Sequence, residues 1–384
     1  MRRLWCVWLA LVSLAHAGDG KVDVHLMPWA ERSLAKYKGH EQETLRERDA
    51  RFAGMKTRFG VRYKSGYRED RPGEAFPLEG YIGMPQPRPC NWYHSGFMKV
   101  TVNGQDVGRT ALASMVVAEA GERAIVDMVW HTPMGAVRVR FLGLPDDDRL
   151  FCEVRVDPKG EECRLQLNLR SYPSFFTSHH RRKGARRVLT PTTEVKEGEK
   201  RQLTVATDDW AFHHDLVFDP ALGEGAGGCA VLVGPEKGAE IRHEPGGYAA
   251  HTFVDFAADT RVARLVFWDF AGQENAVALE QLRARIPATR EQLAALDFTP
   301  TAVRQADFAA LRETVAADLD AAAQVPGTEE LVAQARTWLA SLPPGSARAD
   351  AENGIVGEEV LARWLGEYHT FRWRLRLAVV LSRI

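Results

Sequence analysis

Apolar and polar residues alternate with a period of two in three successive stretches, 136–143, 149–156 and 163–171. In the first stretch, Arg138 and Arg140 alternate with valine and phenylalanine. This alternation is typical of β-strands with one buried and one solvent-facing side. Residues typical of turns, among them Pro, Asp and Gly, separate the three stretches. The pattern therefore predicts a twisted antiparallel sheet at the centre of the fold.

Other parts of the chain carry further signals of secondary structure. More strands are predicted at 97–103, 124–130, 201–206, 212–218, 229–233, 248–256 and 261–268. Their close spacing favours a β-sandwich over alternating strands and helices. Apolar residues at three- and four-residue steps predict an amphipathic helix over 28–60. Alanine, leucine, glutamate and arginine dominate the last part of the chain and predict helices there.

The predicted fold is mainly β, a large antiparallel β-sandwich with an N-terminal helix and a C-terminal α-helical region. We divide the chain into a signal peptide at 1–17, an N-terminal helix and loop region at 18–95, an antiparallel β-sandwich at 96–271 and a C-terminal helical region at 272–384. The tail 371–377 also alternates at period two, which fits either a returning strand or the end of the last helix.

The composition is that of a soluble globular protein. The 384 residues are 45% hydrophobic and 26% charged, with a net charge of −1. A chain this close to neutrality has no overall attraction for nucleic acid, so we expect no nucleic-acid partner. The sequence contains no Gly-x-Ser-x-Gly, phosphate-loop lysine, His-Glu-x-x-His or Cys-x-x-Cys motif. We therefore predict neither a cofactor nor a metal site.

Residues 1–17 have the pattern of a secretory signal peptide. Two arginines precede an apolar run, and Ala15-His16-Ala17 fits the small-x-small rule for cleavage before Gly18. The apolar run is too short to span a bilayer stably. The pattern predicts a periplasmic or extracellular protein with no transmembrane segment after cleavage. An uncleaved N-terminal anchor is the alternative.

Four cysteines follow the predicted cleavage site: Cys90, Cys152, Cys163 and Cys229. In an oxidising compartment they permit two disulfides with three connectivities. If the last two central strands form one hairpin, Cys152 and Cys163 lie diagonally on its apolar face, about 7–8 Å apart. This separation is long for a disulfide. We therefore predict buried thiols.

The segment from Tyr172 to Arg187 concentrates cations behind three aromatic residues. Clustered cations attract anions locally, and the guanidinium fork suits carboxylate or sulfate. A solvated connector between strands is the alternative. The candidate ligand-binding residues here are Tyr172, Arg181, Arg182, Lys183, Arg186 and Arg187, and the candidate catalytic residues are His179 and His180.

A second segment, Asp208–Asp215, gathers three carboxylates, two histidines and a tryptophan. His213 or His214, with Asp215, could form a base with its orienting carboxylate or half of a metal site. Adjacent residues of a strand face opposite sides, so only one of the two histidines can point at a ligand. The alternative is a strand start with polar surface residues. The candidates are His213 and His214 for catalysis and Trp210 for ligand binding.

The polar side of the three central strands carries a third candidate site. Side chains at i and i+2 share a face, so adjacent strands would gather their arginines into one patch that suits an acidic glycan. The patch would comprise Arg138, Arg140, Arg155, Arg164 and Arg170 with Gln166 and Asn168. An ordinary solvated sheet face is the alternative. Arg138, Arg140 and Arg155 are the ligand-binding candidates.

The predicted strands, the signal peptide and this polar face together carry a resemblance. Residues 95–270, above all Val137-Arg-Val-Arg-Phe-Leu-Gly-Leu-Pro-Asp-Asp-Asp-Arg-Leu150, resemble the galactose-mutarotase-like β-supersandwich of secreted glycan-processing enzymes and polysaccharide lyases. The resemblance is architectural and implies a large sandwich and glycan chemistry. No catalytic residue of that family maps onto this chain, so the resemblance assigns no role to any residue.

Two functional classes follow from these observations. One is an exported carbohydrate-binding or carbohydrate-active protein that acts on acidic polysaccharide. As a lyase, it would neutralise a uronate carboxylate with Arg or His and abstract a proton with His or Tyr. The other is a non-enzymatic envelope scaffold or protein-interaction module. Convergence of 172–187 and 208–215 on one cleft favours the first class. Buried aromatic residues with charges in solvent favour the second.

Overall fold

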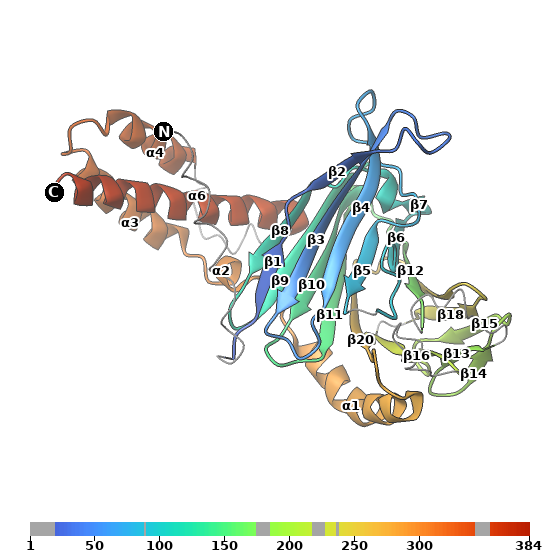
Figure 1. Ribbon diagram of the computed structural model, residues 1–384. Helices are drawn as coiled ribbons and strands as arrows, with labels where there is room; N and C mark the ends of the chain where they lie inside the picture. Colours follow the sequence, from blue (N-terminus) through green and yellow to red (C-terminus); the bar gives the residue numbers. More distant parts are fainter. Residues whose placement is uncertain (1–19, 88–89, 174–184, 217–226, 236–237, 342–353) are drawn as a thin grey trace, which may run out of the picture.

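The computed structural model describes residues 20–87, 90–173, 185–216, 227–235, 238–341 and 354–384. The predicted signal peptide lies outside the described residues, as do His179, His180, Arg181, Arg182 and Lys183. The described part is mainly β, with two large antiparallel sheets and helices towards the C-terminal end (Figure 1). None of the helices in these ranges is long and apolar enough to cross a membrane.

The first sheet has eleven strands among the described residues. In order across the sheet, its main path is β1 (Asp23–Leu26), β3 (Glu43–Ala53), β4 (Gly60–Arg68), β5 (Ile82–Gln86), β6 (Met98–Val102), β12 (Leu165–Ser171), β19 (Ala250–Asp255), β18 (Glu240–Pro245) and β15 (Arg201–Thr204). Two short strands lie off this path, β2 (Ala30–Ser33) beside β3 and β7 (Gln105–Asp106) beside β6. A 3-10 turn, η1 (Val107–Arg109), follows β7.

The second sheet has nine strands among the described residues. In order across the sheet they are β14 (Glu194–Lys196), β13 (Arg186–Leu189), β16 (Trp210–Asp215), β17 (Cys229–Val233), β20 (Val262–Asp269), β11 (Arg149–Pro158), β10 (Gly135–Gly143), β9 (Ala124–Thr132) and β8 (Ser114–Glu119). The ten strands predicted from residue 97 onward are all present, and the prediction of a large antiparallel sandwich is confirmed.

The pairing of the three central strands is only partly as predicted. β10 and β11 are neighbours, with Arg138 opposite Arg155. β12 instead lies in the first sheet, between β6 and β19. The prediction that all three strands form one sheet is therefore wrong. Alternation fixes which face of a strand is buried, but several partners can satisfy it, and the chain after β11 crosses to the opposite sheet.

The helix predicted over 28–60 is also wrong. This stretch forms β2 and β3, and β3 pairs along its length with β4. The apolar residues at helical spacing come from two strands and the turn between them, and Phe52 and Phe59 are both buried between the sheets. Pairing with β4 and burial of these rings outweigh the local helical pattern.

The main core lies between the two sheets and contains the largest buried aromatic side chains, among them Trp92, Trp130 and Phe141. All four cysteines after the predicted cleavage site are buried thiols, as predicted. Cys152 and Cys163 both belong to this core, but they approach it from opposite sheets, because β11 and β12 are not neighbours. Their expected position in one hairpin is therefore wrong.

The helices form two groups. α1 (Asn275–Ala295) packs on the outer face of the second sheet and closes a second apolar cluster. The short α2 (Thr301–Arg304) leads to α3 (Phe308–Ala322), α4 (Glu329–Ser341) and α6 (Gly354–Leu381), whose core is their own. In Figure 1, these three helices extend away from the sandwich. The alternating tail 371–377 is part of α6, so it is helical.

Candidate functional site

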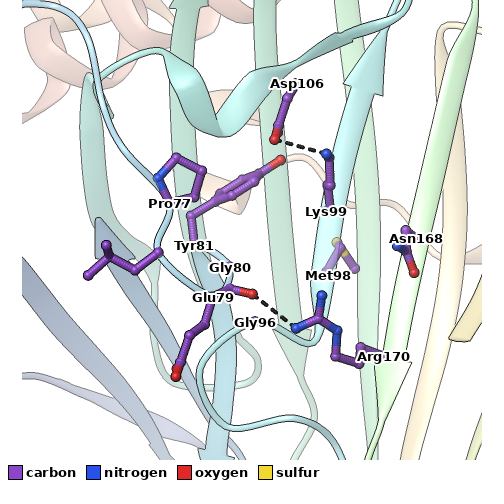
Figure 2. Close-up of a pocket in the computed structure, with 11 residues that line it drawn as sticks. Pro77, Glu79, Gly80, Tyr81, Gly96, Met98, Lys99, Asp106, Asn168 and Arg170 are labelled. Carbon is purple, nitrogen blue, oxygen red and sulfur yellow. Dashed lines mark hydrogen bonds and ion pairs between the residues drawn. The ribbon is translucent and has the colours of Figure 1, made fainter. Parts of the chain in front are cut away.

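Two adjoining cavities open on the outer face of the first sheet. One, of about 160 Å³, lies between the loop at 77–80 and strands β6 and β12 (Figure 2). The other, of about 260 Å³, lies over β6, β12, β18 and β19. Lys99 and Asn168 line both cavities, so the two form one depression, which we call the sheet groove.

Period-two alternation places the side chains of the sheet groove. In β12 the three leucines point into the core, while Gln166, Asn168 and Arg170 point outward. In β19, Phe253 and Asp255 face the same way as the β12 polar residues. These β12 residues belonged to the predicted arginine patch, so the sequence placed this part of the groove correctly on a polar face.

Most charged side chains of the sheet groove are held by a partner. Gln166 Nε2 donates to Asp255 Oδ1 at 2.6 Å, and Lys99 Nζ lies 3.0 Å from Asp106 Oδ2. The guanidinium of Arg242 donates to Glu244 at 2.9 Å, and its carbon lies 4.4 Å from the centre of the Phe253 ring. These contacts fix the donors and acceptors in place before a ligand arrives, which lowers the entropic cost of binding.

Arg170 differs from the other cations of the groove. Its Nη1 donates to the backbone oxygen of Glu79 at 3.0 Å, and its guanidinium lies 5.1 Å from the ring centre of Tyr93. Among the described residues, no carboxylate lies within ion-pair distance of it, and its buried Nε has no hydrogen-bond partner. Figure 2 shows this side chain at the wall of the smaller cavity. Arg170 therefore offers an uncompensated positive charge to a ligand.

Three tyrosines continue the site beyond Arg170. The ring of Tyr172 lies 5.0 Å from that of Tyr248 and 5.9 Å from that of Tyr93, and Arg186 lies 5.0 Å above Tyr172. Burial raises the pKa of both Tyr93 and Tyr172 well above its usual value, so both phenols stay protonated. Tyr248 is 48% exposed and presents this cluster to solvent. Tyr172 itself is buried, so any role in binding would be indirect, as support for Tyr248.

Two glycines let the loop at 77–80 approach the sheet. A Cβ on Gly96 would lie 2.6 Å from the Cα of Gly80 and 3.0 Å from the backbone oxygen of Glu79. These are backbone atoms and cannot rotate away. We expect Gly96→Ala to lower the free energy of unfolding by about 1–3 kcal/mol, measured by urea denaturation. Gly160→Ala is the control, because a Cβ there meets open space, and an equal loss in both variants would contradict the close-approach argument.

The two histidines of the second predicted segment face opposite sides of β16, as expected. His213 is 0% exposed, and its Nε2 lies 2.9 Å from the hydroxyl of Thr252 in the first sheet. Burial lowers its pKa well below the usual value, so the ring is neutral. A catalytic role for His213 stays a prediction, for a ring that is fully buried and neutral in this structure. His214 lies on the other side and stacks on Phe212 at 5.1 Å.

The predicted 172–187 and 208–215 segments meet on neighbouring strands. In the register of β13 and β16, Arg186 lies opposite Asp215 and Arg187 lies opposite His214. Arg187 also forms an ion pair with Glu194 at 3.1 Å. Trp210 is buried in the apolar cluster beneath α1, so it supports packing. Ligand roles for Arg186, Arg187 and the residues at 179–183 remain predictions.

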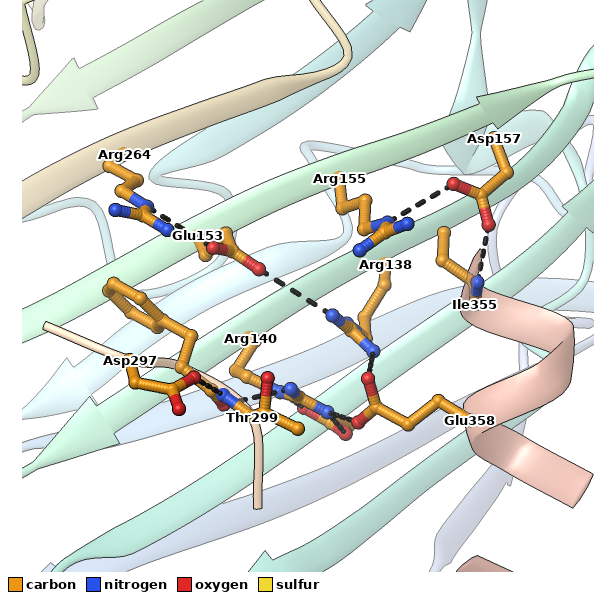
Figure 3. A network of polar contacts seen from close by, with 12 residues as sticks. Arg138, Arg140, Glu153, Arg155, Asp157, Arg264, Asp297, Thr299, Ile355 and Glu358 are labelled. Carbon is orange, nitrogen blue, oxygen red and sulfur yellow. Dashed lines mark hydrogen bonds and ion pairs between the residues drawn. The ribbon is translucent and has the colours of Figure 1, made fainter. Parts of the chain in front are cut away.

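The predicted patch of arginines is wrong as a single solvent-facing surface. Arg164 and Arg170 lie on the first sheet, whereas Arg138, Arg140 and Arg155 lie on the second. Arg138 and Arg140 are 3% and 1% exposed, because the first turns of α6 cover them (Figure 3). Their partners are Asp127, Glu153 and Glu358. Arg155 is partly exposed and pairs with Asp157 at 3.1 Å. Arg138 and Arg140 therefore attach α6 to the second sheet.

Several residues of the sheet groove were not among the sequence candidates. Lys99, Asp255 and Phe253 lie on β6 and β19, and the same alternation that placed Asn168 would have shown them on a polar face. No sequence signal showed that β6 and β19 flank β12. Among the described residues, no three His, Cys, Asp or Glu side chains are grouped to hold a metal ion.

Comparison with known proteins gives no family. No family model matches the chain, and no curated protein matches it either. Solved structures that match include the α-N-acetylgalactosaminidase NagBb from Bifidobacterium bifidum in complex with GalNAc. Its TM-score is 0.40 at 11% identity, over 60% of this chain and 38% of that one. The chain thus spans well under half the length of that enzyme.

Two other solved structures also match at low sequence identity. A putative aldose 1-epimerase from Klebsiella pneumoniae subsp. pneumoniae has a TM-score of 0.40 at 7% identity, over 70% of this chain and 96% of that one. Heparinase III has a TM-score of 0.30 at 8% identity, over 59% of this chain and 35% of that one. These TM-scores are too low to bear on activity.

Proposed function

We propose that the protein binds a glycan in the sheet groove and that this glycan carries carboxylate or sulfate groups. The observation that carries the proposal is the mixed lining of the two adjoining cavities. The lining combines the ring of Phe253 with side-chain amides, three cations and three carboxylates: Gln166, Asn168, Lys99, Arg170, Arg242, Glu79, Asp106 and Asp255. Sugar hydroxyls both donate and accept hydrogen bonds, and Gln166 and Asn168 offer both functions in one side chain.

The shape of the groove supports an extended ligand. Cavities of about 160 and 260 Å³ are each smaller than the sites of ordinary drug-sized ligands. They adjoin through Lys99 and Asn168, so neighbouring units of a chain could occupy them in turn. The exposed ring of Tyr248, beyond Arg170, extends the same surface.

The acidic character of the ligand rests on Arg170. Its guanidinium has no carboxylate partner among the described residues, while Lys99 and Arg242 are already paired. Hydrogen bonds between guanidinium and carboxylate or sulfate are about twice as strong as neutral ones. The predicted signal peptide would place this groove outside the cytoplasm, where polysaccharides are accessible. Export of the protein is part of the same proposal.

Binding of uronate-rich, sulfated and neutral oligosaccharides by isothermal titration calorimetry tests the proposal. We expect Arg170→Gln to weaken binding of the acidic ligands by about tenfold, the equivalent of about 1.4 kcal/mol. Phe253→Ala should weaken acidic and neutral ligands alike. Arg51→Gln is the matched control, because Arg51 is an exposed arginine on β3 of the same sheet, outside the groove.

Two outcomes would contradict parts of this proposal. Equal affinity for acidic and neutral glycans, with no effect of Arg170→Gln, would remove the acidic ligand. Binding unchanged in both groove variants, or no glycan binding at all, would remove the groove as the site and favour the envelope scaffold. Raising the salt concentration should weaken the acidic ligands selectively, because the Debye length falls from about 10 Å at 0.1 M to about 3 Å at 1 M.

A further inference from the structure

The far end of α6 carries a row of exposed apolar side chains. Trp373 is 65% exposed, Leu377 36%, Val380 54%, Leu381 59% and Ile384 98%. Helices of soluble proteins usually bury such residues. A contiguous group of them on one helix marks a surface that meets another apolar phase.

Four of these residues lie on one face of α6, because Trp373, Leu377, Val380 and Leu381 are spaced four, three and one residues apart. Ile384 follows just beyond the end of the helix. The opposite face of α6 is already occupied, since Leu361, Leu365, Tyr368 and Leu375 are buried against α3 and α4. α6 is therefore apolar on two sides, one for its own bundle and one for a partner. We call the second side, with Ile384 just beyond it, the outer stripe: Trp373, Leu377, Val380, Leu381 and Ile384.

The charged side chains that α6 itself carries beside the outer stripe are arginines. From Tyr368 to Ile384 the chain has four arginines and no acidic residue. Arg372 and Arg376 form ion pairs with Asp318 of α3. Arg374 and Arg383 have no carboxylate within ion-pair distance in the described chain, so they leave local positive charge next to the stripe.

An apolar stripe flanked by arginines, with a tryptophan at one end, is the pattern of a helix that lies in the headgroup region of a membrane. The apolar side chains enter the acyl boundary, arginines bind phosphate groups, and the indole prefers the interface. A second copy of the chain fits less well, because pairing two such stripes would bring arginines from both copies close together. The charge therefore selects anionic lipid as the partner.

We propose that the outer stripe docks the protein onto the surface of an anionic lipid bilayer. In Figure 1 the end of α6 lies on the far side of the molecule from β12 and β18, which carry the sheet groove. Docking at this end leaves the groove open to solvent. The inference is independent of what the groove binds.

Vesicle co-sedimentation of the full chain tests this proposal. We expect binding to vesicles of phosphatidylcholine and phosphatidylglycerol in equal parts, at least tenfold weaker binding to phosphatidylcholine alone, and loss of binding at high salt. The double variant Trp373→Ser with Val380→Ser should lose binding. Arg374→Glu with Arg383→Glu should lose it on anionic vesicles only.

Val277→Ser is the matched control, because Val277 is 49% exposed on α1, away from the outer stripe. All substituted residues are exposed, and thermal melting of each variant confirms that it is folded. Equal binding to both vesicle types, or unchanged binding of the Trp373 and Val380 double variant, would overturn the proposal. A lipid-free dimer in sedimentation velocity that dissociates in this double variant would assign the stripe to a second copy instead.

Discussion

Replacing Glu358 by leucine should lower the free energy of unfolding by about 3–5 kcal/mol, the cost of removing one partner of a buried ion pair. Glu358 lies in the second turn of α6, where one carboxylate oxygen meets Arg138 Nη1 at 2.6 Å and the other meets Arg140. All three side chains are less than one-tenth exposed (Figure 3). The substitution would leave two guanidinium groups under a helix with too few acceptors.

The ionisation of this network supports the size of the effect. Burial alone would raise the pKa of Glu358, but Arg140 and Arg138 outweigh it and hold the pKa below its usual value. Glu358 is therefore a charged carboxylate, and it accepts hydrogen bonds from both Arg138 and Arg140. Asp127 can satisfy Arg140 only in part, and Glu153 lies 3.5 Å from Arg138 and also serves Arg264.

Glu359→Leu is the control for this prediction, because it makes the same chemical change one residue further along α6. Its carboxylate is 31% exposed and pairs with His131 at 3.1 Å, also near the surface. Exposed ion pairs contribute about 0–1 kcal/mol. Urea denaturation followed by circular dichroism measures both variants. Similar losses would mean that the buried charges do not hold α6 on the sheet.

Loss of Glu358 should also let the first turns of α6 open locally while the rest of the protein stays folded. Ile355 seats beside Val129 and Ala136, and its backbone N–H donates to Asp157. These contacts contribute less to holding the start of α6 on the sheet than the ion pairs of Glu358 do. Hydrogen exchange of the first turns of α6 should therefore quicken in Glu358→Leu before the strands of the sandwich are affected.

Alternation along the chain was enough to place side chains on faces. Asn168 and Arg170 were predicted on a polar face and line the sheet groove, and His213 and His214 were predicted on opposite sides of one strand. Period two in a strand is a local property of the backbone, so it can be recognised without a partner. This is why ten of the strands after residue 97 were predicted, although β7, β8, β13, β14 and β18 were missed.

Partners across space could not be predicted in this way. Glu358 reaches Arg138 and Arg140 from more than two hundred residues away, and no local pattern marks it as the residue that covers them. For the same reason, β12 was predicted in the wrong sheet, and Phe253 was not among the predicted site residues. A polar face is compatible with solvent, with a ligand or with a docked helix, and only the fold decides which.

Acidification should destabilise the protein through two buried histidines. His213 of β16 and His243 of β18 share the hydroxyl of Thr252, which lies 2.9 Å from a ring nitrogen of each. All three are 0% exposed. Protonation places an N–H on both nitrogens of a ring, and the second nitrogens, His213 Nδ1 and His243 Nε2, are buried without a hydrogen-bond partner among the described residues. The bridge therefore requires both imidazoles to be uncharged.

The direction of the pH effect follows from the pKa values. Burial lowers the pKa of His243 from 6.5 to about 4, and it lowers that of His213 well below its usual value. Between about pH 6.5 and about pH 4, these histidines bind protons in the unfolded chain but not in the folded chain. Stability is therefore full above about pH 6.5 and falls as the pH drops towards about 4. The shift of His243 alone corresponds to about 3 kcal/mol.

Other groups titrate in the same range, so the measurement is a difference between proteins. Burial raises the pKa of Asp269 to about 7, which favours the folded state on acidification and opposes the histidines. Going from about pH 7 to about pH 4 lowers the free energy of unfolding. We expect this drop to be smaller by at least about 3 kcal/mol in the double variant His213→Gln with His243→Gln than in the wild type. Urea denaturation at both pH values gives this quantity.

The matched control replaces His25 and His369 by glutamine, because both are exposed and lie far apart in the chain. That variant should keep the pH dependence of the wild type, because it removes two imidazoles and leaves the buried pair and Thr252 unchanged. An unchanged pH dependence in the His213 and His243 variant would show that the buried pair gains a proton without cost. The two sheets would then be held together across Thr252 by packing rather than by neutral imidazoles.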